Sequence, residues 1–102
     1  MSSCSVRVQI PWQLQRLANC AAELELTVES PGTQRSLLAA LAEAHPPLRD
    51  AVVDPHTGKR RPLLRFFACK EDHTFLGLDA PLPEAVLEGR EPFLIIGAIS
   101  GG

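Results

Sequence analysis

Residues 93–102 read Phe93-Leu94-Ile95-Ile96-Gly97-Ala98-Ile99-Ser100-Gly101-Gly102, and much of the architecture can be reasoned from them. The first part is apolar and β-prone, which predicts a buried strand over 93–98. The second part holds small residues and ends on two glycines, which predicts a narrow, mobile tail over 99–102. We therefore expect a folded domain over 1–98 followed by this tail. Our working hypothesis is that the Gly102 carboxyl group is the reactive centre and that Gly101 gives it conformational freedom.

The alternation along this strand also predicts a surface. If Phe93 and Ile95 point toward a helix, Leu94 and Ile96 must point to the opposite face of the sheet. A sheet without a second helix layer would expose them, and exposed apolar patches commonly mark a partner site. We therefore assign Leu94, Ile96 and Ile99 to partner binding. The alternative is that the first two are buried under a long connection or in a homodimer.

Upstream, the sequence predicts one main helix and several strands. Strict alternation indicates strands over 5–10 and 23–29, and apolar character indicates further strands over 63–69 and 74–78. Helical spacing predicts a helix over about 33–45, with Thr33 as its N-cap and an end at His45, which precedes a proline. We expect a hairpin connection with one helical turn over 12–22, and a polar turn over 70–73. The segment 48–54 is compatible with either a short strand or a helical turn.

The order of these elements indicates the fold class. Two strands, a helix and two or three further strands suit a mixed sheet of four to five strands. The opening hairpin can be antiparallel, and the apolar last strand suits the middle of the sheet, beside and parallel to the first. One helix on one face of such a sheet is an α+β roll, the β-grasp arrangement.

Composition narrows the function classes. The chain has 102 residues, 45% of them hydrophobic and 22% charged, as expected for one soluble globular domain. A net charge of −2 and a pI near 5.9 argue against binding to nucleic acid or to an anionic membrane. We find no membrane span and no signal peptide. Three widely spaced cysteines, Cys4, Cys20 and Cys69, indicate reduced thiols in the cytoplasm.

Several motifs resemble those of one protein family. Asp72 after a strand, the run Gly77-Leu78-Asp79-Ala80-Pro81-Leu82, and the last strand with Gly101-Gly102 are similar to the ubiquitin-like sulfur carriers. These include the small subunit of molybdopterin synthase and the carrier of the thiamine pathway. The segment His45-Pro46-x-Leu48-Arg49 looks more like a longer subgroup that includes the carrier of the cysteine pathway.

The resemblance implies a reaction cycle. An E1-like adenylating enzyme would activate Gly102 with ATP, and a sulfurtransferase would convert it to a thiocarboxylate. A synthase subunit would then accept the sulfur for molybdopterin, cysteine, thiamine or a similar product. The resemblance thus implies a carrier that is not itself an enzyme and binds no cofactor, ATP being used by the activating enzyme.

Other functions remain open at this point. A ubiquitin-like modifier or a pure interaction domain would use the same tail and sheet face, with Gly102 joined to a lysine or dispensable for binding. For an enzyme we find no paired carboxylates, triad or metal cluster at suitable spacing. His45, His56 and His73 lack the spacing of metal ligands.

Overall fold

The computed structural model describes residues 3–97, which form a single mixed sheet with helices packed against it. The sheet has five strands in the order β2-β1-β5-β3-β4. Their bounds are Ser3–Gln9 (β1), Glu23–Glu29 (β2), Leu64–Ala68 (β3), Glu71–Asp72 (β4) and Phe93–Gly97 (β5). β5 lies in the middle, parallel to β1 and antiparallel to β3. The predicted fold class and the predicted place of the last strand are both confirmed.

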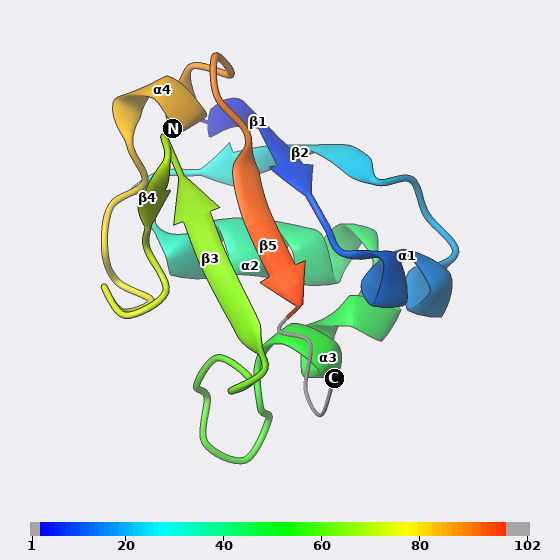
Figure 1. Cartoon of the computed structure of the whole chain (residues 1–102). Helices are drawn as coiled ribbons and strands as arrows, with labels where there is room; N and C mark the ends of the chain where they lie inside the picture. Colours follow the sequence, from blue (N-terminus) through cyan, green and yellow to red (C-terminus); the bar gives the residue numbers. More distant parts are fainter. Residues whose placement is uncertain (1–2, 98–102) are drawn as a thin grey trace.

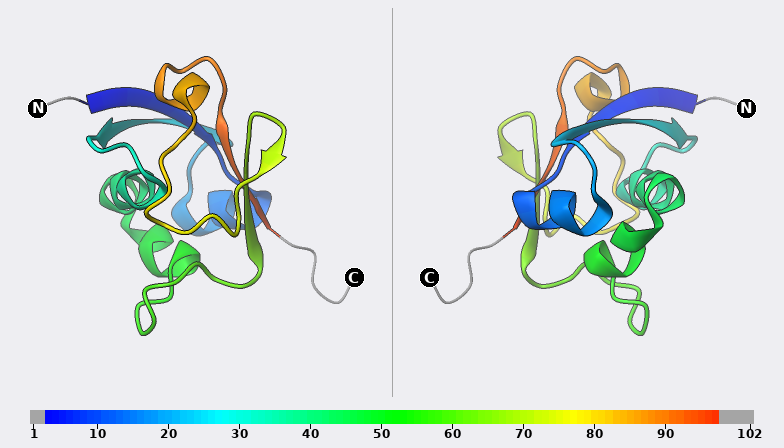
Figure 2. Two further views of the ribbon diagram at one scale, coloured as in Figure 1. Left: turned by 90° about the vertical axis from the view of Figure 1, so that its left-hand side faces the viewer. Right: turned by 90° about the vertical axis from the view of Figure 1, so that its right-hand side faces the viewer.

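Of the helices, α2 (Gln34–Ala44) covers one face of this sheet (Figure 1 and Figure 2). Their bounds are Trp12–Ala18 (α1), Gln34–Ala44 (α2), Pro46–Leu48 (η1, a 3-10 turn), Arg49–Val52 (α3) and Glu84–Leu87 (α4). α2 lies behind the sheet in Figure 1, and Figure 2 shows α2 and α3 together on the same side of it. Within residues 3–97, no helix lies on the opposite face, which is in front in Figure 1. The segment 48–54, for which the sequence left a short strand and a helical turn open, is helical as far as Val52, and Val53 forms an isolated β-bridge with Arg60.

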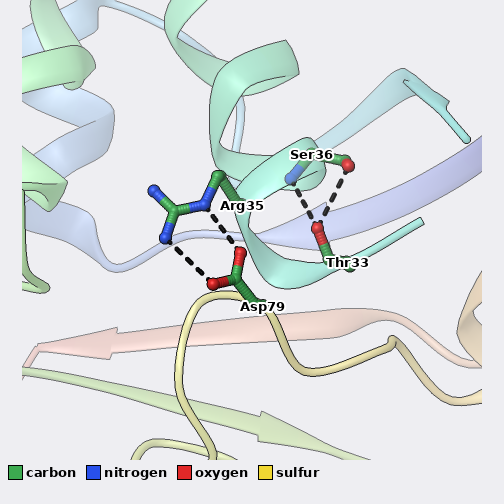
Figure 3. Close-up of polar contacts among 4 residues, drawn as sticks. All are labelled: Thr33, Arg35, Ser36 and Asp79. Carbon is green, nitrogen blue, oxygen red and sulfur yellow. Dashed lines mark hydrogen bonds and ion pairs between the residues drawn. The ribbon is translucent and has the colours of Figure 1, made fainter. Parts of the chain in front are cut away.

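The start of α2 is fixed by its cap and by a distant loop (Figure 3). The Thr33 hydroxyl accepts a hydrogen bond from the Ser36 backbone N–H at 3.2 Å, which satisfies one of the unpaired donors of the first turn. Arg35 donates its own N–H to the Leu78 carbonyl at 2.8 Å, and its guanidinium contacts Asp79 at 2.9 Å. The predicted N-cap is therefore confirmed, and the 78–80 loop holds the helix in place.

The core lies between α2 and the sheet. Alternate residues in the central parts of β1, β2, β3 and β5 are buried there, as the alternation predicted, whereas both residues of β4 are exposed. The two largest side chains, Phe66 and Phe93, pack with their ring centroids 5.4 Å apart. The other buried members are Val6, Val8, Ile10, Leu14, Leu26, Val28, Leu37, Leu38, Leu41, Leu48, Val52, Leu64, Ala68, Leu82, Val86 and Ile95.

One connection is more helical than we expected. Residues 12–22 were predicted to hold a single helical turn, but α1 spans seven residues. Its Leu14 is buried in the core, and the Pro11 carbonyl accepts the N–H groups of Leu14 and Gln15. Tertiary packing thus stabilises a helix that is too short to persist alone.

The predicted strand over 74–78 is wrong. Residues 74 to 78 are turns, and the strand after β3 is β4, inside the segment predicted to be a polar turn. The chain reverses immediately at Cys69 and Lys70, whose φ angles are 53° and 66°, and positive φ at both positions is what a two-residue hairpin loop of type I′ requires. Farther along, the Thr74 hydroxyl accepts from the Phe66 N–H at 2.8 Å, so a side chain occupies the place of a ladder bond.

Candidate functional site

The site is built on β5, whose two faces differ. Phe93 and Ile95 point into the core and are 0% and 2% exposed, whereas Ile96 is 42% exposed and Leu94 is half-buried. The predicted division of this strand into an anchoring face and a surface face is the one observed. Burial of the anchoring face holds β5 in register between β1 and β3.

Strand pairing brings further side chains to the helix-free face. Leu94 lies opposite Gln9 on β1 and Phe67 on β3, and Ile96 lies opposite Arg65. We call Phe67, Leu94 and Ile96 the open-face patch. Phe67 and Arg65 were not singled out from the sequence, although the alternation in 63–69 places them on the other face of the strand from the buried Leu64 and Phe66.

A basic and aromatic rim lies beyond β3. Phe75 is 73% exposed, and the guanidinium carbons of Arg60 and Arg65 lie 5.3 and 5.4 Å from its ring centroid. Such cation–π contacts hold an exposed ring in a defined position. The Arg60 guanidinium also donates to the Leu64 carbonyl. This rim was not predicted, because the apolar residues of 74–78 were assigned to a strand, whereas this segment contains no strand and exposes Phe75.

Arg7 positions the loop that leads into β5. Its guanidinium donates to the carbonyls of Gly89 and Arg90 at 3.1 and 3.0 Å, and contacts the Glu23 carboxylate at 3.6 Å. One side chain on β1 thereby joins β2 to the loop before β5. The pKa of Glu88 in this loop is held below its ordinary value, mainly by hydrogen bonding to Arg90.

Gly97 ends the described part of the chain against α1. A Cβ atom at this residue would lie 3.4 Å from the Gln13 side-chain oxygen and 3.6 Å from the Pro11 Cβ. The chain therefore leaves β5 beside the first turn of α1. The predicted site residues Ile99, Gly101 and Gly102, with the predicted tail over 99–102, lie outside the described residues.

The remaining His, Cys, Asp and Glu side chains of the described residues form no metal centre. Within residues 3–97, no three His, Cys, Asp or Glu side chains lie close enough together to hold a metal ion. The three cysteines are free and half-buried, and burial raises the pKa of the Cys20 thiol, the opposite of what activates a nucleophile. In the same part of the chain, no helix has the length and apolar character needed to span a bilayer.

Solved structures resemble this chain along nearly its whole length. No protein-family model matches it, and no curated protein does. Small archaeal modifier protein 1 (SAMP1) of Haloferax volcanii matches with a TM-score of 0.75 and 20% identity, covering 96% of this chain and 99% of that chain. CysO of Mycobacterium tuberculosis matches with a TM-score of 0.71 and 21% identity, over 92% and 99%. A chain of the BexX/CysO complex of Amycolatopsis orientalis matches with a TM-score of 0.72 and 20% identity, covering 95% of this chain and 99% of that chain.

These matches cover 92 to 96% of this chain and 99% of the solved chains, so the likeness in fold extends over nearly the whole domain. The matched proteins are ubiquitin-like sulfur carriers and modifiers of the kind that the sequence motifs resemble. With a mixed sheet whose central last strand lies parallel to the first, and with α2 covering one face of that sheet, this chain has the β-grasp fold of the ubiquitin-like proteins.

Proposed function

We propose that this protein is a cytoplasmic ubiquitin-like sulfur carrier whose chemistry takes place on the carboxyl group of Gly102. The observation that carries the proposal is the build of β5 and its surroundings. The strand is anchored on one face by Phe93 and Ile95, and it bears the exposed open-face patch on the other. A partner that binds the patch is thereby positioned beside the segment that follows Gly97.

The proposed activation has two balanced steps. In the first, a Gly102 carboxylate oxygen attacks the α-phosphorus of ATP on an E1-like adenylating enzyme, forming an acyl adenylate and releasing pyrophosphate. In the second, hydrosulfide sulfur, delivered by a sulfurtransferase, attacks the acyl carbon, and AMP leaves with formation of a thiocarboxylate. Glycine suits the last two positions because it lacks Cβ and enters narrow channels in any required conformation. The carrier contributes the acyl group and the docking surface.

The open-face patch is the proposed docking surface for the activating enzyme, and in turn for the sulfurtransferase and the sulfur-accepting synthase subunit. CysO of Amycolatopsis orientalis occurs in a complex with BexX, which supports the idea that proteins of this fold work by docking. The acceptor we propose belongs to molybdopterin, cysteine, thiamine or related biosynthesis. The genes beside this one distinguish among these acceptors, since each pathway has its own synthase.

Intact-mass spectrometry tests the proposal. The protein is incubated with ATP, a sulfide source and the E1-like enzyme of its own genome. We expect a product heavier by the difference between sulfur and oxygen, located at Gly102. Ile96→Arg should slow its formation, whereas Leu17→Arg should not, because Leu17 is similarly exposed at 53% but lies on α1. Absence of the product with every E1-like enzyme of that genome would refute the carrier function.

A second candidate is supported by the likeness to SAMP1, which is named as a modifier. In that function the activated Gly102 is transferred to a lysine amine, giving an isopeptide bond. Peptide mass spectrometry of cell extracts decides between the two. A branched lysine carrying the C-terminal residues indicates a modifier, and a free thiocarboxylate with no branched product indicates a carrier.

A further inference from the structure

A groove runs between the edge strand β2 and helix α2, away from the open-face patch. Its volume is about 830 Å³. On the helix side it is lined by the small residues Ser36, Ala39 and Ala40, and acidic residues Glu25, Glu29 and Glu43 lie along it. Small side chains on a helix facing a sheet edge leave room for an additional extended segment.

The backbone of β2 is free along this groove. β2 is the outermost strand on its side of the sheet, and its register with β1 is antiparallel. Ile10 donates its N–H to the Ala22 carbonyl at 2.9 Å, and in an antiparallel ladder every second pair is bonded in this way. The backbone groups of Leu26 thus face β1, whereas the N–H and C=O groups of Glu25 and Thr27 point outward. No hydrogen bond from a described residue outside the sheet reaches these groups.

The charge of the groove selects its occupant. Glu25, Glu29 and Glu43 make no ion pair with any side chain in residues 3–97. Arg35 lies in the lining, but its guanidinium is engaged 2.9 Å from Asp79 (Figure 3). The groove is therefore acidic. Pairing of β2 with β2 of a second copy would bring two acidic rows together, and like charges across strands are destabilising.

We propose that the β2–α2 groove binds an extended basic segment of a partner protein, which adds to the sheet as a strand beside β2. The backbone of that segment would bond to the free groups of Glu25 and Thr27. Its alternate side chains would fall into two sets. One set, small and apolar, would face Ala39 and Ala40, and the other, basic, would face Glu25 and Glu29. This site uses neither Gly102 nor the open-face patch, so it is a second interaction surface.

An NMR titration tests this proposal with the full-length ¹⁵N-labelled protein. The probe is a short synthetic peptide in which lysine and valine alternate, and the control probe has glutamate in place of lysine. We expect saturable shifts at β2 and α2 with the lysine peptide and none with the glutamate peptide. Deleting Gly101 and Gly102, which abolishes carrier function, should leave the titration unchanged, so that the two proposals fail separately.

Four variants sharpen the test. Glu25→Lys combined with Glu29→Lys should raise the Kd about tenfold, since attraction is replaced by repulsion at two positions. Thr27→Pro should abolish binding because it removes an outward N–H without touching a ladder bond, whereas Thr27→Val should not. Glu71→Lys on β4 changes charge at the opposite edge and should leave the Kd within about twofold. Thermal melting checks that each variant is folded.

The proposal is overturned by any of three results. The first is that the lysine peptide produces no saturable shifts, and the second is that its shifts map to the open-face patch. The third is that Glu71→Lys weakens binding as much as the change at Glu25 and Glu29. The last result would show that only the net charge of the protein matters.

Discussion

Replacing Ile95 and Ile96 by alanine, one at a time, separates the two faces of β5. Ile95 is 2% exposed, so Ile95→Ala removes buried carbon and leaves a cavity in the core. Removing three carbon atoms at about 0.8 kcal/mol each loses about 2.4 kcal/mol of transfer free energy. The unfilled cavity brings the expected loss in the free energy of unfolding to about 3–4 kcal/mol.

Ile96 is 42% exposed, so roughly three-fifths of its surface is shielded from solvent. Scaling the transfer loss by this fraction gives about 1.4 kcal/mol for Ile96→Ala. An alanine here leaves no enclosed cavity, because no helix of the described part of the chain covers this face. The neighbouring substitutions should therefore differ in cost by at least about twofold, although the chemical change is the same.

Urea unfolding followed by far-UV circular dichroism measures both values. The m-values should stay equal, so that the difference lies in the transition midpoint. Thermal melts should show a fall of roughly 15 °C or more for Ile95→Ala and of several degrees for Ile96→Ala. If Ile95→Ala does not fold, Ile95→Val replaces it, with an expected loss of about 1 kcal/mol.

Binding to the activating enzyme should show the reverse order. Ile96→Ala should weaken it, because the side chain belongs to the open-face patch, and a folded Ile95 variant should bind normally. Equal destabilisation by Ile95→Ala and Ile96→Ala would refute the assignment of one face to the core and the other to the surface. Equal loss of binding would refute the docking role of the patch.

Three further predictions concern the elements around the site. Thr33→Ala should lower the free energy of unfolding by about 1 kcal/mol in urea titrations, because it removes the cap of α2. Gly32→Ala should cost about 1–2 kcal/mol in the same assay, because the φ of Gly32 is +71° and a side chain is strained there. The Asp72 carboxylate accepts hydrogen bonds from Thr74, and these hold the pKa of Asp72 below its ordinary value. The contribution of the Thr74 hydroxyl is the largest, and that of the Thr74 N–H is next. The contribution of Asp72 to stability is thus full above about pH 4 and lost as pH falls through the lowered pKa. Melting temperatures of wild type and Asp72→Asn should accordingly converge on acidification.

The first two of these predictions have matched controls. Thr57→Ala removes a hydroxyl that accepts only a turn N–H, from Lys59, and should have a smaller effect than the loss of the cap. A Cβ atom at Gly32 would also lie 3.0 Å from a methyl carbon of Leu87. Gly58 has the same φ of +71° but no atom within 4 Å of an added Cβ, so Gly58→Ala measures the backbone strain without that contact. A melting-temperature difference for Asp72→Asn that widens on acidification would contradict the sign of its pKa shift.

Local sequence patterns were enough to predict the helix and strands whose apolar residues recur at a regular period. The alternation around Val6, Leu26 and Ile95 correctly indicated which side chains face the core. Helix α2 was predicted with its N-cap, because the apolar stripe, Thr33 and the proline after His45 all agree. The predictions failed where local preference is weak: α1 is stabilised by burial of Leu14, and the strand after β3 was misplaced by one tight turn.

What the sequence alone determined is which residues of one element share a face, because strand and helix geometry repeat at fixed periods. Only the tertiary structure decided which elements lie next to one another. Phe67 joined Leu94 and Ile96 because β3 pairs with β5, and Phe75 joined the rim because Arg60 and Arg65 hold its ring. The acidic groove likewise exists because α2 passes beside the free edge of β2. Such contacts depend on long-range pairing, which no local period encodes.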